Sequence, residues 1–202
     1  MDALYPKIKE IESRLAERER DLFNLDQTVF LYDLTSTYFE GRCEKNWKAK
    51  KGYSRDKRFD CDQVVVGLVV NRVGFPLCHE VFPGNTQDRK TLPHMLGLLD
   101  ARVGFKPGQT VVVDRGMAYA ENLEQIRSRN LHYLVASRQP ERDQWLGEFE
   151  DGEGFEEMKL TRSPTNPYQK KSPVRVRMKK TPDETHVLCL SEGRTQKDRA
   201  IR

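Results

Sequence analysis

The sequence is poor in the residues that build zinc sites, disulfide frameworks and membrane spans. Its four cysteines include no pair at CxxC spacing, and its four histidines show no ligand spacing. The longest apolar run, Val64 to Val70, is interrupted by Gly67 and is much too short to span a membrane. No apolar leader stands at the amino end. These absences predict a cytoplasmic protein with reduced thiols, no zinc site and no membrane partner.

Charge is abundant but nearly balanced, so its distribution is more informative than its sum. Of the 202 residues, 33% are charged and 37% are hydrophobic, which is enough for one modest core. The net charge of +4 is too small to indicate a nucleic-acid partner by itself. Between positions 41 and 58, however, eight basic residues stand against Glu44 and Asp56: Arg42, Lys45, Lys48, Lys50, Lys51, Arg55, Lys57 and Arg58.

Two short apolar runs each end in an aspartate. Val29 to Tyr32 precedes Asp33, and Val111 to Val113 precedes Asp114. Open α/β sheets place their ligands at the carboxyl ends of strands, so a fold that joined these runs would bring two hard oxygen ligands together. Such a pair suits Mg²⁺ or Mn²⁺. Alternatively, either aspartate caps the turn that follows its strand.

An amphipathic helix is predicted over residues 4–22. Its apolar residues recur at steps of three and four with charges between them, at Leu4, Ile8, Ile11, Leu15 and Leu22. This stripe either packs on the domain or belongs to a connector from an upstream region.

Strands and helices are predicted to alternate along the next hundred residues. The predicted strands are Thr28–Asp33, Cys61–Val73, Leu77–Phe82, Thr110–Asp114 and Leu131–Ala136, with helices from about Thr91 and over Ala118–Arg129. A three-stranded meander followed by alternating α and β resembles the ribonuclease-H-like α/β fold, a mixed sheet with flanking helices. Residues 139–202 are predicted to form a mostly β insertion and a tail, after a helix or connector at 1–24 and a core at 25–138.

Four segments, in order, resemble the DDE transposases of bacterial insertion sequences, specifically the IS-four-like group. They are Phe30–Gly41 around the first aspartate, Gly52–Asp56, Val81–Asp88 after the hairpin, and Val113–Met117 around the second aspartate. The resemblance covers roughly residues 25–138. It implies metal-dependent cleavage and transfer of DNA strands, with transposon ends and target DNA as partners and a dimeric synaptic complex in full-length relatives.

By this resemblance, Asp33 and Asp114 are the first two metal-binding acids of a catalytic triad that holds Mg²⁺ or Mn²⁺. The third is a glutamate on a late helix, in a pattern of tyrosine, arginine, glutamate and lysine that the sequence does not show. Its last glutamates are Glu184 and Glu192. We therefore expect a fragment that lacks the amino-terminal DNA-binding region and the glutamate-bearing segment of the family, and whose strand cleavage is lost or nearly so.

The basic segment 41–58 is expected to contact DNA, with Trp47 and Tyr53 positioned to stack on a base. Arg115 either joins these basic residues as a phosphate contact or pairs with Asp33. The alternative is a mobile, solvated loop. Thr35, Ser36 and Thr37 either contact a phosphate or hydrogen-bond within a turn, whereas Asn85 and Asp88 indicate a turn and a helix start rather than ligands.

Three functions compete at this point. The first is a transposase catalytic core, and the second is a non-catalytic remnant that binds DNA or an intact relative. The third is a phosphatase with Asp33 as its nucleophile. The phosphatase is the weakest, because Leu34-Thr35 supplies no second acid two residues after Asp33.

Overall fold

The computed structural model describes residues 3–23, 28–150, 153–158, 173–191 and 193. The chain divides into two compact units, Met1–Arg138 and Gln139–Arg202. Each unit is described by itself below. Within the described ranges, no helix is long and apolar enough to cross a membrane.

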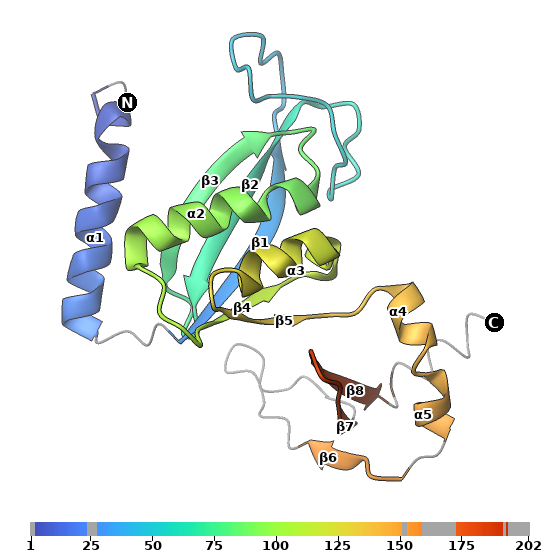
Figure 1. The fold of residues 1–202 in the computed structure, drawn as a ribbon. Coiled ribbons are helices and arrows are strands. Elements are labelled where there is room, and N and C mark those ends of the chain that lie inside the picture. The colour runs from blue at the N-terminus through green and yellow to red at the C-terminus, as the bar shows by residue number, and fades with distance from the viewer. Residues whose placement is uncertain (1–2, 24–27, 151–152, 159–172, 192, 194–202) are drawn as a thin grey trace. The chain divides into compact units, whose positions relative to one another are not determined.

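The first unit is built on a five-stranded mixed sheet in the order β3-β2-β1-β4-β5 (Figure 1). Strands β1, β2 and β3 form an antiparallel meander, and β4 and β5 run parallel to β1. This topology confirms the predicted ribonuclease-H-like fold. The strands are β1 Val29–Tyr38, β2 Gln63–Asn71, β3 Pro76–Pro83, β4 Thr110–Val113 and β5 His132–Val135.

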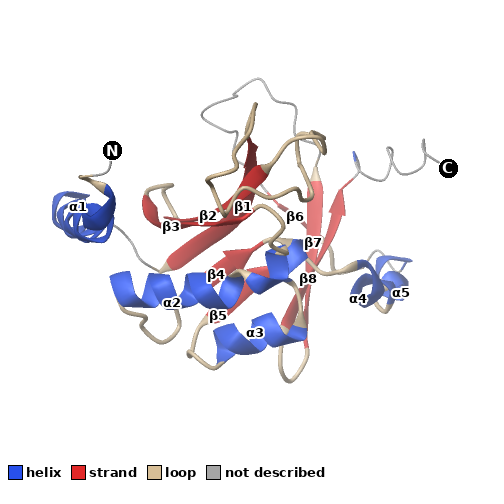
Figure 2. Cartoon of the chain, turned by 90° about the horizontal axis from the view of Figure 1, so that it is seen from above, coloured by secondary structure: helices blue, strands red, loops and turns tan. Residues whose placement is uncertain are grey.

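Two helices cover one face of this sheet (Figure 2). Helix α2 crosses from β3 to β4, and α3 crosses from β4 to β5, as parallel connections require. Short 3₁₀ turns precede each of them. The helical elements of the unit are η1 Tyr5–Lys7, α1 Ile8–Phe23, η2 Asp88–Lys90, α2 Leu92–Val103, η3 Arg115–Met117 and α3 Ala120–Arg127.

The core lies between the sheet and these two helices. The apolar face of α2, formed by Leu92, Met95, Leu96 and Leu99, is buried. Pro93 is tolerated because it lies within the first turn, where its missing N–H has no helical partner. Alternate residues of the strands point to the same side of the sheet and pack against this face. The central buried side chains are Phe30, Leu34, Val69, Leu92, Met95, Leu96, Leu99, Val111 and Ile126.

The opposite face of the sheet carries exposed apolar side chains. Leu31 is 38% exposed, Leu68 is 41% exposed and Leu134 is 56% exposed. Leu31 and Leu134 lie on either side of Val112 of β4, which pairs with both, and Leu68 lies opposite Asp33. Leu31, Asp33 and Thr35 of β1 alternate with the buried Phe30, Tyr32 and Leu34, so their side chains lie on this exposed face.

The expectation that β1 ends at Asp33 is wrong. The strand continues to Tyr38, and Asp33 lies within it, paired with Leu68 of β2. Antiparallel pairing with β2 extends to Tyr38 opposite Gln63, and the threonines of the segment are good strand formers. Thr35, Ser36 and Thr37 consequently lie in a strand and not in a turn.

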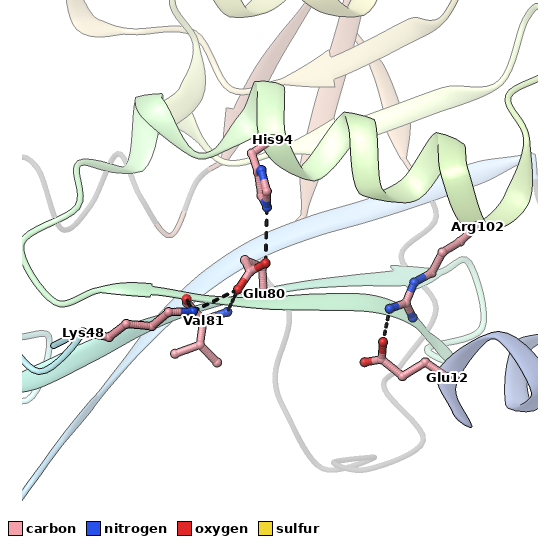
Figure 3. Close-up of polar contacts among 6 residues, drawn as sticks. All are labelled: Glu12, Lys48, Glu80, Val81, His94 and Arg102. Atoms are coloured by element: carbon pink, nitrogen blue, oxygen red, sulfur yellow. Dashed lines mark hydrogen bonds and ion pairs between the residues drawn. The ribbon is translucent and has the colours of Figure 1, made fainter. Parts of the chain in front are cut away.

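Helix α1 forms as predicted, but its apolar stripe does not reach the core. Ile8, Ile11 and Leu15 are 39%, 40% and 55% exposed. The helix instead contacts the domain through a neighbouring face, where Glu12 pairs with Arg102 of α2 (Figure 3). Glu12 also pairs with His79 of β3 at 2.8 Å. Leu22, the last residue of the predicted apolar stripe, has a side chain that lies outside the described residues.

The second unit contains a three-stranded antiparallel sheet in the order β6-β7-β8. These strands agree with the mostly β character predicted for residues 139–202. Two short helices at the start of the unit were not predicted. Its elements are α4 Gln139–Asp143, α5 Leu146–Glu150, β6 Glu156–Met158, β7 Val174–Lys180 and β8 Thr185–Ser191.

Candidate functional site

Asp33 and Asp114 lie on neighbouring parallel strands at equivalent positions. Tyr32 of β1 pairs with Val113 of β4, and each aspartate is the next residue along its strand. Asp114 remains extended, with φ −73° and ψ 160°, so the two backbones stay adjacent at the strand spacing of about 4.8 Å. Both side chains are exposed. The sheet therefore brings together the two acids that the sequence indicated.

The two carboxylates are supported differently. The backbone N–H of Leu34 donates to Asp33 Oδ1 at 2.7 Å, which leaves the second oxygen of Asp33 for another partner. Asp114 follows the end of β4 and precedes η3, whose first residue is Arg115. Arg115 is exposed at this edge of the sheet.

A third carboxylate lies beside Asp114. Asp88 begins η2, as the helix-start interpretation requires. A Cβ built on Gly116 would lie 3.4 Å from Asp88 Oδ2 and 3.8 Å from Asp114 Oδ2, so the two carboxylates flank this glycine. Asp88 also pairs with Arg55 of the basic segment at 3.4 Å. The loop after β3 thus meets the loop after β4, because both strands end at the same edge of the sheet.

The donor set suits a hard divalent cation. Aspartate oxygens on adjacent strands are the ligands that Mg²⁺ and Mn²⁺ prefer. Within the described ranges, no three Asp, Glu, His or Cys side chains gather closely enough to hold an ion. The sheet therefore brings two aspartates together, and the described residues add no third ligand to complete such a group.

A buried tyrosine underlies the site from the core side. Burial raises the pKa of Tyr32 well above its ordinary value, and the nearby charges of Asp88 and Asp33 add to the shift. Its hydroxyl stays protonated and donates to Thr91 Oγ1 at 2.7 Å. The Thr91 hydroxyl in turn donates to the carbonyl oxygen of Asp88 at 2.7 Å. This chain links β1 to the turn that carries Asp88.

The basic segment is anchored to the sheet edge and is not a free loop. The side-chain amide of Gln63 donates to Tyr53 O at 3.0 Å and to Gly84 O at 2.9 Å. The backbone N–H of Gly84 donates to Lys48 O at 3.0 Å, and Lys50 exchanges two backbone hydrogen bonds with Gln63. A Cβ on Gly84 would lie 2.0 Å from Gln63 O, so this close approach requires glycine.

Within this segment, some basic side chains are occupied by the protein itself. Lys48 Nζ donates to Val81 O at 2.6 Å and pairs with Glu80 at 3.3 Å, and His94 contacts the same carboxylate at 3.2 Å (Figure 3). Arg58 makes two hydrogen bonds to Asp60 at 3.0 Å and lies over the ring of Tyr38.

Other members of the segment face outward. Trp47 is 69% exposed and Tyr53 is 81% exposed. The exposed basic residues of the segment are Arg42, Lys45, Lys50, Lys51, Arg55 and Lys57. Arg55 also receives support from β1, because its backbone N–H donates to Ser36 Oγ at 3.4 Å.

Sequence reasoning missed one cluster at this edge. Arg89 lies over the Tyr119 ring, 5.4 Å from its centroid, and Arg138 lies over the same ring at 4.4 Å. The three residues come from the segments that follow β3, β4 and β5. No local spacing joins them, so only the strand order reveals their proximity.

Known proteins with related structures include transposases, all at low identity. The Mos1 transposase paired-end complex with left transposon end has 13% identity and a TM-score of 0.39, over 70% of this chain and 52% of that chain. For the piggyBac transposase synaptic complex with hairpin DNA, the identity is 13%, the TM-score 0.44, and the coverage 94% and 40%. The chain thus spans about half or less of these two proteins. No curated protein matches the chain.

The mixed sheet has the strand order of a ribonuclease-H-like domain, with Asp33 within β1 and Asp114 directly after the neighbouring parallel strand β4. Residues 24–191 match the family described as the transposase DDE domain. The chain belongs to this family.

Proposed function

We propose that this chain is the catalytic core of a transposase of the IS-four-like group, in which Asp33 and Asp114 bind Mg²⁺ or Mn²⁺ for the cleavage and transfer of DNA strands. The observation that carries the proposal is the parallel register of β1 and β4, which sets the two aspartates side by side. Membership in the DDE domain family supports the reaction class.

The metal site lies on the sheet face that α2 and α3 leave uncovered. A divalent ion held there would act as a Lewis acid on the attacking hydroxyl and on the phosphate. Asp33 and Asp114 would hold the ion, and the backbone N–H of Leu34 orients the Asp33 carboxylate. Both carboxylates are exposed, as contact with a phosphate group requires.

DNA approaches across the anchored basic segment. Its exposed lysines and arginines supply phosphate contacts, and Trp47 and Tyr53 offer rings on which a base could stack. Lys48 and Arg58 have a smaller share in this surface, because Glu80 and Asp60 already pair with them. The segment reaches the acids through Arg55, which pairs with Asp88.

The described residues contribute two acids of the family's triad. Of the last two glutamates in the sequence, Glu184 belongs to the turn between β7 and β8 in the second unit, and Glu192 lies outside the described ranges. We accordingly propose that this chain binds metal weakly and is crippled in strand cleavage. A chain of this kind would bind DNA without cleaving it, and non-catalytic DNA binding is the second candidate function.

Iron-directed cleavage of the polypeptide tests the metal site without requiring DNA chemistry. Fe²⁺ replaces Mg²⁺ at oxygen sites, and with ascorbate and dissolved oxygen it generates radicals that cut nearby backbone. We expect fragments that end near positions 33 and 114, and their loss in Asp33→Asn and Asp114→Asn. Unchanged fragments in both variants, or cuts elsewhere only, would reject the site.

A nicking assay with Mn²⁺ and supercoiled DNA tests the crippled state. We expect cleavage at background level. Robust nicking that Asp33→Ala abolishes would show that the chain is catalytically complete. Rapid hydrolysis of a phosphomonoester, with no effect of Asp114→Asn, would instead favour the phosphatase.

A further inference from the structure

We propose that Arg89, Tyr119 and Arg138 form a second phosphate-binding site for DNA, separate from the basic segment and beside the loop that follows Asp114. The proposal rests on the proposed DNA-binding function of this chain and extends it to residues on three other loops. Its starting point is the convergence of two guanidiniums on one ring, with centroid distances of 5.4 Å for Arg89 and 4.4 Å for Arg138.

The cluster adjoins both acidic loops. Strands β1, β3, β4 and β5 run in the same direction, so the segments after β3, β4 and β5 leave the sheet at one edge. Arg89 directly follows Asp88, and Tyr119 lies on the η3 connection that begins after Asp114. A DNA strand whose phosphate reached Asp114 would therefore extend over the Tyr119 ring.

The loops are held in this arrangement by a buried side chain. Asn122 is only 5% exposed, and its amide donates to Arg89 O and to Met117 O, both at 3.1 Å. One side chain thus joins the turn that carries Arg89 to the turn that carries Tyr119. Because both bonds go to backbone, they orient the two loops and leave the Arg89 guanidinium outside.

The charge of the cluster favours an anion. Arg89 is exposed, and its Nε donates to the neutral Gln87 Oε1 at 3.1 Å. Within the described part of the chain, no carboxylate pairs with Arg89. The positive charge of the exposed Arg89 is therefore available to a phosphate oxygen. Guanidinium groups match the geometry of phosphate oxygens.

The ligand is the phosphate backbone and not a base. Two cations already engage the Tyr119 ring within the range of cation–π attraction, so little of the ring remains for stacking. Backbone contacts of this kind position a duplex without reading its sequence. The basic segment, with its exposed Trp47 and Tyr53, then provides the stacking surface.

Salt-dependent binding of the full chain to a fluorescein-labelled, mixed-sequence DNA duplex tests the site. A lost phosphate contact lowers the slope of log K against log salt by about 0.9. We expect this change in Arg89→Gln and in Arg138→Gln. Tyr119→Leu should weaken binding by about two- to fivefold, as loss of cation–π support predicts, whereas Tyr119→Phe retains the ring and the affinity.

Arg127→Gln is the matched control, because Arg127 lies over the ring of Tyr133 at 5.2 Å at the opposite end of α3. Its slope should equal that of the unchanged protein. If Arg89→Gln and Arg138→Gln keep the full slope while Lys51→Gln lowers it, the cluster lies off the DNA path and this inference is wrong, with the proposed function intact. If none of the three alters binding, the DNA-binding function itself fails. A thermal melt of each variant excludes unfolding as the cause.

Discussion

The hydroxyl of Tyr32 donates a hydrogen bond to Thr91 Oγ1 at 2.7 Å, which ties the first strand of the sheet to the turn that carries Asp88. Tyr32 is 4% exposed, and burial raises the pKa of its hydroxyl, so the donor remains protonated across the working pH range. Tyr32 directly precedes Asp33 in β1. The strength of this hydrogen bond can be measured without disturbing the acids themselves.

Replacement of Tyr32 by Phe should lower the free energy of unfolding by about 1 kcal/mol, the usual net contribution of a buried hydrogen bond. Urea unfolding gives the value. A double-mutant cycle with Thr91→Val should show a coupling energy of similar size, since each variant removes the same bond. Tyr53→Phe, at a tyrosine that is 81% exposed, is the control and should be neutral. A coupling energy near zero would show that the bond does not stabilise the fold.

Gly84 should tolerate no side chain. A Cβ at this position would lie 2.0 Å from Gln63 O and 2.4 Å from Lys50 O, and both atoms belong to the backbone. We expect Gly84→Ala to cost about 2–4 kcal/mol, as severe overpacking does, or to separate the basic segment from β2. Urea unfolding measures the first outcome, and hydrogen exchange at Lys50 and Gln63 measures the second.

Gly97 is the matched control for this substitution. It lies inside α2, and a Cβ there would meet no atom within 4 Å. Gly97→Ala should therefore raise the free energy of unfolding by about 0.5–1 kcal/mol through helix propensity. Equal effects of the two substitutions would contradict the close approach at Gly84.

The part of the fold that was predictable from sequence is the part determined by local periodicity. The buried face of α2 follows from the three- and four-residue steps of Leu92, Met95, Leu96 and Leu99. Both central aspartates follow short apolar runs that predict strands. These features need no knowledge of distant partners.

The features that were missed depend on pairing between distant segments. Pairing with β2 extends β1 past Asp33, although polar residues follow the aspartate. The stripe of α1 stays exposed because Glu12, and not a leucine, makes the contact with Arg102. Arg89, Tyr119 and Arg138 meet only because three strands end at one edge. No local sequence pattern carries this information.

Glu80 should make stability depend on pH in the acid range. Burial alone would raise its pKa, but hydrogen bonds from His94, from the N–H of Val81 and from Lys48 hold the pKa below its ordinary value. A carboxyl whose pKa is lowered in the folded state stabilises the protein above its unfolded pKa of about 4.3. That contribution disappears as the pH falls through the lower, folded pKa.

Comparison of Glu80→Gln with the unchanged protein, by urea unfolding at a series of pH values, measures this effect. The variant should be less stable by about 0.5–1 kcal/mol above pH ~5, in the range of partly screened ion pairs, and the difference should shrink as the pH falls below ~4. Glu124→Gln, on the exposed face of α3, should show no such trend. A difference that grows toward low pH would contradict the lowered pKa.

Loss of either central aspartate should weaken binding of Mn²⁺ without weakening the fold. Both side chains are exposed, and in Asp33→Asn the amide oxygen would still accept the Leu34 N–H, so Asp33→Asn and Asp114→Asn keep their local geometry. Removal of a direct ligand should lower the affinity by at least about tenfold, since loss of an outer partner alone costs about 10- to 100-fold. The free Mn²⁺ signal in electron paramagnetic resonance titrations gives the affinity, with Glu124→Gln as the control. Equal affinities in all four proteins would place the ion elsewhere, and an effect of Asp114→Asn alone would assign it to the Asp88–Asp114 side of Gly116.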